Sequence, residues 1–556
     1  MLDFVDYIVI GAALVLSAGI GMYYRRQANA TEYMVANGTM SPLPVAFSLM
    51  ASFMSAITLL GVTNENYAFG TQFVVINLAY ILGTPIAAYL YIPTFFRLDS
   101  PSAYAYLQKR FGLATRIAAS LAFSLQMVLY MGIVLYAPAL ALSAVTQMSY
   151  LGSILSVGLV CTFYSTIGGI KAVLVTDVFQ SLLMFAAIGS VVFGGTNHVG
   201  SVSKVLELAD DRLQFFDFRL DPTIRHTFWT QTVGGTFIFL SIYAVNQAQV
   251  QRLLTTRSVK SAQKALWIQW PILAALSLTT SFAGLVIHAY YRFCDPVKQG
   301  RIDKGDQLLP LFVVDTMSQT PGLAGLFISG IFSGSLSTVS SAINSLAAVT
   351  LEDYLKPFIH IKPESETFLL KVLAMSFGIG CVLLTFLVEF LGPGVLQASL
   401  TIFGVVGGPL LGVFTLGMFT TRANQSGALT GLVTSLAFLF WIGFGQPKPP
   451  VIPLPTYTNG TDCISVNGTN QAMLSAETEE DSPNYFYPYC ISYAWYAMIG
   501  TFITFTVGYL TSLMTCDPPH VDPELLTPPL RNRMLSNEND QTIHEKHKNF
   551  ELLQVQ

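Results

Sequence analysis

Residues 48–61 read SLMASFMSAITLLG, a run without a charged residue that is rich in small and hydroxyl-bearing side chains. The run lies within an apolar stretch near residues 44–64, which is long enough for a bilayer core that needs about 20 apolar residues per helix. Transporters often bind cargo near the middle of the membrane, where a helix is interrupted and its backbone groups become free to act as ligands. We therefore expect the helix at residues 48–61 to be interrupted and to contribute to a binding site.

Similar apolar stretches recur along the whole chain. Of its 556 residues, 52% are hydrophobic and only 11% carry a charge, whereas soluble domains have about 25% charged residues. Such a chain cannot cover itself with a solvated surface, so lipid must be its main solvent. We predict an all-α polytopic membrane protein with about 13 transmembrane helices within residues 1–515. The stretches are residues 7–24, 44–64, 66–96, 117–170 (two helices), 178–203, 226–251, 265–291, 317–351, 367–390, 390–421, 423–447 and 482–516.

The composition also argues against other classes of protein. The net charge is only -4, and the sequence has no basic patch of the kind that nucleic-acid binding requires. None of the six cysteines forms a CxxC pair and the seven histidines do not cluster, so no metal or redox site is predicted. The sequence therefore supports neither an enzyme nor a cofactor.

The positive-inside rule sets the orientation of these helices. An odd number of crossings puts the two termini on opposite sides of the membrane. Placing the N-terminus outside puts most of the 28 lysine and arginine residues inside, as the rule requires. The remaining ones fall only in the three longest outer loops, where the rule is weakest. We predict a multi-pass protein of the plasma membrane with its N-terminus outside and its C-terminus inside.

The loop before the last predicted helix supports this orientation. Asn459 and Asn467 each begin an Asn-Gly-Thr glycosylation sequon, and Cys463 and Cys490 could form a disulfide in the oxidising exterior. Sequons also arise by chance, because this topology places three others inside or at the inner face, at Asn29, Asn37 and Asn424. Residues 517–556 are polar and contain several prolines, so we expect a disordered cytoplasmic tail.

Two further runs resemble the first in their polar content. Residues 234–252 read GGTFIFLSIYAVNQAQVQR, and residues 329–345 read SGIFSGSLSTVSSAINS. In the second run Ser337 and Ser341 are four residues apart, so they share one helix face, with Thr338 beside them. Hydroxyl oxygens that face free carbonyls suit sodium, a hard cation that prefers oxygen ligands. The alternative is packing, because small residues let helices approach closely and hydroxyls can bond to their own backbone.

Several longer runs, in the right order, make the membrane region recognisable. They are SLMASFMSAITLLG (48–61), YMGIVLYAPALAL (130–142), CTFYSTIGGIKAVLVTDVFQ (161–180), YAVNQAQVQR (243–252), SGSLSTVSSAINSLAAVTLEDYLKP (333–357) and FGVVGGPLLGVFTLGM (403–418). These runs resemble the sodium/solute symporter family, in the branch of sodium-coupled monocarboxylate, multivitamin and iodide transporters. Within this branch the chain is most similar to the sodium-coupled monocarboxylate transporters. The resemblance implies a LeuT-type 5+5 inverted repeat, with core repeats at about residues 44–196 and 226–420.

The resemblance also implies two sodium sites. The first site joins the second and ninth helices, through backbone carbonyls of Ala51, Met54 and Gly334 and the hydroxyls of Ser337 and Thr338. In relatives that carry two sodium ions, the positions of the second site match Asp177, Ser340 and Ser341. The alternative for Asp177 is an ion pair with a basic residue at the cytoplasmic mouth, because an unpaired carboxylate in a membrane is costly.

The resemblance places the cargo cavity between the second, third, seventh and eleventh helices. The candidate lining residues are Phe53 as an apolar wall and the polar residues Thr58, Tyr243, Asn246 and Gln247; each could instead be structural. Sugar-transporting relatives carry a histidine and a tryptophan where this chain has Thr58 and Tyr243, which argues against sugars. The iodide transporter carries a glutamine at the position of Thr58, which argues mildly against iodide. No lysine or arginine is available there, so an anion would be held by hydroxyls, amides, half-helix dipoles and nearby sodium.

The sequence therefore predicts a sodium-coupled symporter that imports small organic anions by alternating access. We expect short monocarboxylates such as lactate, pyruvate and short-chain fatty acids as cargo, with sodium, the anion and the lipid bilayer as partners and no nucleic acid. The alternatives are a biotin/pantothenate or iodide transporter and, in another class, a sodium-gated sensor or leak pathway that accumulates nothing. One sodium ion per anion would sustain only about tenfold accumulation and two about a thousandfold, so we predict two.

Overall fold

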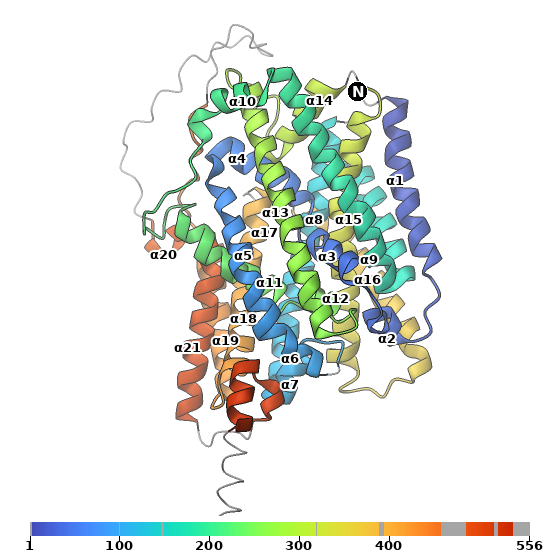
Figure 1. Cartoon of the computed structure of the whole chain (residues 1–556), viewed down its shortest axis with the longest axis vertical. Helices are drawn as coiled ribbons and strands as arrows, with labels where there is room; N and C mark the ends of the chain where they lie inside the picture. Colours follow the sequence, from blue (N-terminus) through green and yellow to red (C-terminus); the bar gives the residue numbers. More distant parts are fainter. Residues whose placement is uncertain are drawn as a thin grey trace, which may run out of the picture.

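The computed structural model describes residues 3–98, 100–145, 150–318, 320–388, 394–456, 485–515 and 521–536. Regular structure in these residues is helical, apart from one isolated bridge between Met40 and Thr256. The long helices lie roughly side by side along one axis of the molecule (Figure 1). The predicted all-α class is confirmed.

The helices divide into those before and those after the long loop near residue 220. The first group comprises α1 (Phe4–Tyr23), α2 (Ala30–Val35), α3 (Pro42–Ala51), α4 (Thr63–Phe69), α5 (Ile76–Ile86), α6 (Ile92–Arg97), α7 (Ala105–Arg110), α8 (Leu113–Val145), α9 (Tyr150–Val199) and α10 (Val202–Leu208). The second group comprises α11 (Gly235–Tyr243), α12 (Gln247–Leu253), α13 (Val259–Tyr290), α14 (Leu308–Met317), α15 (Leu323–Val349), α16 (Pro363–Val388), α17 (Val395–Ile402), α18 (Gly408–Phe419), α19 (Gln425–Phe444), α20 (Tyr487–Cys490) and α21 (Tyr496–Met514). Five π-helical segments continue some of them, at Thr58–Val62, Ala87–Tyr91, Thr230–Gly234, Thr350–Leu355 and Phe403–Gly407.

The described residues contain many helices that can be compared with the predicted crossings. Ten helical segments there are long and apolar enough to cross a bilayer. One of them belongs to α9, whose 50 residues would span about 75 Å as a straight helix. A non-helical Gly169, at φ 60 and ψ -167, instead divides α9 into two crossings. The interrupted pairs α3–α4 and α11–α12 supply two more, so thirteen crossings can be assigned.

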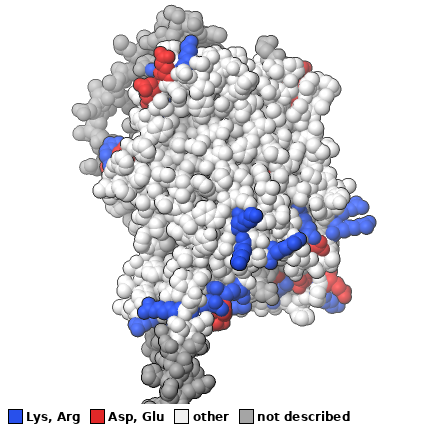
Figure 2. Space-filling view, in the orientation of Figure 1, with Lys and Arg blue, Asp and Glu red and all other residues white. Residues whose placement is uncertain are grey.

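The surface agrees with a membrane-spanning body. Figure 2 shows a broad belt almost without charged side chains, with charges gathered toward the two ends of the molecule. The N-terminus lies at one end, and residues 521–536 lie at the other (Figure 1). The two ends of the described chain therefore lie on opposite faces, whereas the side that each one faces stays a prediction.

The predicted disordered tail is wrong for residues 521–536. Leu526 is fully buried, and Arg97 donates to its backbone carbonyl at 2.6 Å and to that of Glu524 at 3.0 Å. The Thr527 amide also donates to the carbonyl of Met418 at 3.1 Å. This segment is ordered because it caps the ends of α6 and α18, a contact that composition does not reveal. Residues 537–556 lie outside the described part of the chain.

The cysteines of the outer loops are arranged differently from the prediction. Cys490 is a free thiol, so the predicted Cys463–Cys490 disulfide does not form in this structure. Cys294, which follows α13, is disulfide-bonded instead. Cys463 and the two sequon asparagines, Asn459 and Asn467, lie outside the described residues, so their predicted glycosylation stays a prediction.

Candidate functional site

The second crossing is interrupted where the sequence predicts it. Helix α3 ends at Ala51, the next four residues are not helical, and helical structure resumes at Ala56 and runs through the π-helical segment into α4. The Ser55 hydroxyl accepts a hydrogen bond from the Ile57 amide at 3.1 Å, which caps the second half of the helix. We call residues 52–55 the helix break.

The hydroxyls of α15 meet the end of α3 at this break. Ser337 Oγ donates to the Ala51 carbonyl at 2.8 Å, and Thr338 Oγ1 lies 3.4 Å from the same oxygen. Thr338 Oγ1 also donates to the Gly334 carbonyl at 3.0 Å. Both hydroxyl side chains are fully buried. Four of the five residues predicted for the first sodium site are therefore joined by hydrogen bonds, and the fifth, Met54, lies in the helix break.

Helix α15 approaches the break too closely for any side chain at Gly334. A Cβ at this position would lie 2.7 Å from the Ala56 nitrogen and 2.9 Å from the Ser55 carbonyl carbon. Both are backbone atoms, so they cannot rotate out of the way. The small residues of α15 thus allow close packing, and that packing brings the hydroxyls within reach of the free carbonyl.

Two of the three residues predicted for the second sodium site, Asp177 and Ser341, contact a buried arginine. Arg252 and Asp177 are both fully buried, with 3.7 Å between Arg252 Nη2 and Asp177 Oδ2. The same guanidinium nitrogen donates to the hydroxyl of Ser341. Ser340 donates only to a carbonyl of its own helix, that of Ser337, at 3.0 Å. In this structure Asp177 therefore forms the ion pair that we gave as the alternative, and its partner comes from α12.

A cavity of about 40 Å³ lies beside the helix break. Three of the five predicted cargo residues, Phe53, Thr58 and Tyr243, line it. The other lining residues come from the same predicted helices, with additions from α8 and α13. They are Met54, Ser55, Ile57, Val62, Phe73, Ile76, Tyr80, Tyr130, Gly235, Ile238, Phe239, Ile242, Ser277, Leu396, Ser399, Leu400 and Phe403.

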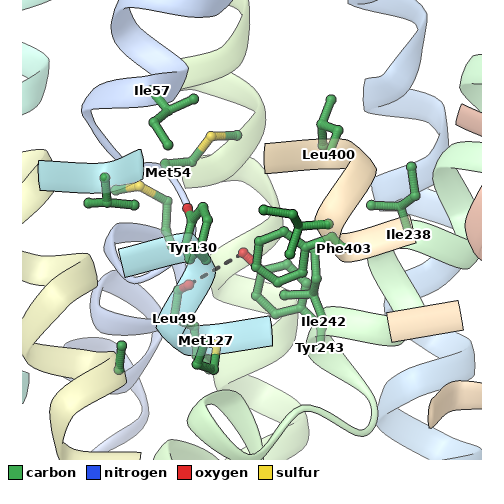
Figure 3. Close-up of a cluster of buried hydrophobic side chains, with 14 of the residues drawn as sticks. Leu49, Met54, Ile57, Met127, Tyr130, Ile238, Ile242, Tyr243, Leu400 and Phe403 are labelled. Atoms are coloured by element: carbon green, nitrogen blue, oxygen red, sulfur yellow. Dashed lines mark hydrogen bonds between the residues drawn. The ribbon is translucent and has the colours of Figure 1, made fainter. Parts of the chain in front are cut away.

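Aromatic rings form much of the wall of this cavity. The Phe53 ring lies 6.0 Å from the Tyr243 ring and 5.5 Å from the Phe403 ring, and Phe403 packs edge-on against Tyr130 at 4.7 Å. The Tyr243 hydroxyl points to the Leu49 carbonyl at 3.3 Å (Figure 3). Hydroxyls are the main polar groups among these walls, and no lysine or arginine of the described part of the chain lines the cavity.

Asn246 and Gln247 are not among the residues that line this cavity, so their role in binding cargo stays a prediction. Asn246 caps α12 by accepting from the Ala248 amide at 3.0 Å. Gln247 accepts from the Ala103 amide at 2.7 Å and donates to the Pro101 carbonyl at 2.8 Å. At the break between α11 and α12, Asn246 therefore caps its own helix, and Gln247 bonds to the chain that precedes α7.

A second cavity of about 340 Å³ lies next to the first, and Leu396 lines both. Arg225 crosses it, donating to the Glu65 carboxylate at 2.7 and 3.0 Å and to Gln397 at 2.7 Å. No sequence pattern marks this arginine, because it lies in a long loop. Tyr130, in contrast, lies in the quoted run at residues 130–142, but its place in the wall depends on how α8 packs.

Comparisons with known proteins agree with this architecture. The model of the sodium:solute symporter family matches residues 33–435. The chain is 54% identical to the putative sodium-dependent multivitamin transporter of Drosophila melanogaster, over 91% of this chain and 86% of that protein. It is 41% identical to sodium-coupled monocarboxylate transporter 2 of Homo sapiens, over 92% of this chain and 84% of that protein.

A solved structure shares the fold. A Na+-coupled sialic acid symporter in a substrate-bound outward-open state superposes with a TM-score of 0.78 and 24% identity, over 93% of this chain and all of that one. The two interrupted crossings fit the LeuT-type inverted repeat that we expected, one at the start of each half. The chain belongs to the sodium:solute symporter family, in the branch that contains the monocarboxylate and multivitamin transporters, and it is a sodium-coupled solute symporter, not an enzyme.

Proposed function

We propose that this protein imports a monocarboxylate anion together with sodium by alternating access. The observation that carries the proposal is that one helix break adjoins both the hydroxyls of α15 and the cavity. Ala51, at its start, meets the hydroxyls of α15, while Phe53 and Thr58, a few residues later, line the cavity. An ion and a cargo molecule bound here would order the same short segment, which is the physical basis of coupling between two sites.

Sodium would act on the α15 side of the break. A cation held between the Ala51 carbonyl and the two hydroxyls would replace the hydrogen bonds that now join them. It would also fix the backbone at Phe53, which forms part of the cavity wall. Cargo would then bind a wall already ordered by sodium, so each partner raises the affinity for the other.

The cavity suits a carboxylate attached to an apolar body. Its aromatic walls can hold hydrocarbon, while the hydroxyls of Thr58, Tyr130, Ser277 and Ser399 can donate to carboxylate oxygens. The second half of the interrupted helix begins at the Ser55 cap, so the positive end of its dipole is directed toward the break. No basic side chain is needed if these donors and a nearby sodium share the negative charge.

Among monocarboxylates, the size of the cavity favours the short ones. A volume of about 40 Å³ holds only a few water molecules, so lactate, pyruvate or a short fatty acid would fit after a small expansion. The second candidate class is biotin and pantothenate, which are also monocarboxylates. The 54% identity to a protein named as a multivitamin transporter favours these larger cargoes, which would require the wall to open further.

An uptake panel in cells that express the protein tests this proposal. We expect lactate and butyrate to enter at least ten times faster with external sodium than without it, together with inward current, and biotin, pantothenate, nicotinate and iodide to enter more slowly. Faster entry of biotin or pantothenate would support the second candidate. Sodium-dependent current without accumulation of any solute would contradict both and favour a sensor or leak pathway.

A further inference from the structure

The Arg252 guanidinium joins four helices at one buried point. Arg252 belongs to α12 and is only 1% exposed. Its Nε donates to the Ser48 hydroxyl of α3 at 2.8 Å, and its Nη1 donates to the Ala248 carbonyl of its own helix at 2.6 Å. Its Nη2 reaches Ser341 of α15 and Asp177 of α9. Every guanidinium nitrogen is engaged, so this arginine is held in one position.

These contacts satisfy only one of the two carboxylate oxygens of Asp177. Its Oδ2 accepts from the Ser48 hydroxyl at 2.5 Å and lies 3.7 Å from the guanidinium. Its Oδ1 is buried and has no hydrogen-bond partner among the described residues. A buried carboxylate with a free oxygen is costly and attracts a cation. The carboxylate thus has lone pairs to offer beyond those that Arg252 uses.

The arginine cluster adjoins the first predicted sodium site. Ser341 Oγ also donates to the Ser337 carbonyl and lies 3.1 Å from the Ser52 hydroxyl. Ser52, in the helix break, donates to the Ser48 carbonyl at 2.5 Å. Ser341 bonds both to the Ser337 carbonyl and to Arg252. A change in the first predicted sodium site can therefore reach the contacts of Arg252 through one side chain.

We propose that Arg252 is an inner latch that holds α3 and α12 against α9 and α15, and that it exchanges with a sodium ion at Asp177. The proposal rests on the proposed function, because it presumes that sodium enters the protein. The latch closes the path between these helices while the guanidinium neutralises Asp177. The latch opens when a second sodium ion binds the Asp177 carboxylate and the Arg252 guanidinium moves away together with α12.

The exchange explains how opening could be made dependent on sodium. If Arg252 left without a replacement, Asp177 would remain as an uncompensated buried charge, which is strongly unfavourable. One cation replacing another keeps the site neutral in both states. Opening without sodium is thereby suppressed, and so is a leak of ions through an empty carrier.

The test uses purified full-length protein in liposomes and measures ²²Na⁺ flux without any organic cargo. We expect Arg252→Gln to raise this flux at least tenfold, because sodium no longer competes with a tethered cation for Asp177. Arg252→Lys keeps the positive charge but loses the forked contacts, so its flux should lie between those of the wild type and of Arg252→Gln. Adding Asp177→Asn to the glutamine variant should remove the extra flux, because the carboxylate that draws sodium is lost.

Arg110→Gln is the matched control. Arg110 is also buried, but its guanidinium donates to the backbone carbonyls of Gly417, Ala423 and Thr420, so we expect its cargo-free flux to equal that of the wild type. Folded Arg252→Gln protein with wild-type flux would overturn the proposal.

A second variant keeps the proposal testable if Arg252→Gln does not fold. Asp177→Asn should lower the Hill coefficient for sodium from about two in the wild type to about one, and an unchanged coefficient would overturn the proposal. Failure of the proposed function can be distinguished from failure of the latch. In that case the wild-type protein itself would show no sodium-dependent uptake.

Discussion

Replacing Ser337 and Thr338 together by alanine is expected to raise the sodium concentration needed for half-maximal uptake by at least 100-fold. The two hydroxyls meet the Ala51 carbonyl at 2.8 and 3.4 Å, and they would be two of the oxygen ligands of the cation. A buried polar group that loses its partner costs about 1–3 kcal/mol, so two lost ligands account for a change of this size. Uptake of the best cargo should be measured over a range of external sodium, with surface labelling to count the protein at the membrane.

Ser345→Ala is the control on the same helix. Its hydroxyl donates only to the Ala342 carbonyl one turn earlier, at 3.0 Å, so its loss removes a polar group of equal size without touching the break. We expect its sodium dependence to match the wild type. A double variant of Ser337 and Thr338 that reaches the surface and keeps its normal sodium dependence would refute the first sodium site.

The fold could be predicted because membranes impose strict lengths. Apolar stretches of about 20 residues mark helices, and the fourth and fifth crossings could be separated by length alone. The interruption at residues 52–55 agrees with the small and hydroxyl side chains there, but this pattern alone does not decide it, because α15 carries the same residue types and is continuous. That Ser337 and Ser341 of α15 share one face could be predicted from helical spacing, which puts residues four apart on the same side.

The partner of Asp177 could not be predicted in the same way. Its depth in the membrane implied that it needs a partner, but several basic residues were available near the inner ends of helices. The predicted apolar stretch ends at residue 251, so Arg252 falls just outside it and its burial is not visible in the hydropathy. The break between α11 and α12 turns α12 inward and buries Arg252 completely. The contacts of Asn246 and Gln247 beside this break were likewise not visible in the sequence.

Gly334→Ala should sharply reduce transport, although glycine in a helix is usually less stable than alanine by about 1 kcal/mol. The added Cβ would lie 2.7 Å from the Ala56 nitrogen and 2.9 Å from the Ser55 carbonyl carbon. Backbone atoms cannot move aside individually, so α15 and the helix break must separate. The Ala51 carbonyl would then move away from the two hydroxyls of α15, and we expect the sodium concentration for half-maximal uptake to rise by at least 30-fold.

Gly189→Ala provides the comparison, because nothing lies within 4 Å of a Cβ added to this glycine of α9. We expect this variant to transport within twofold of the wild type.

The pair of glycine variants also separates the two interpretations of the small residues in α15. If they serve packing alone, Gly334→Ala would lower the amount of folded protein at the surface, while the surviving molecules would keep their normal sodium dependence. If the close approach holds the oxygens of a sodium site together, the surviving molecules themselves must bind sodium more weakly, and a normal half-maximal concentration in them would contradict that function.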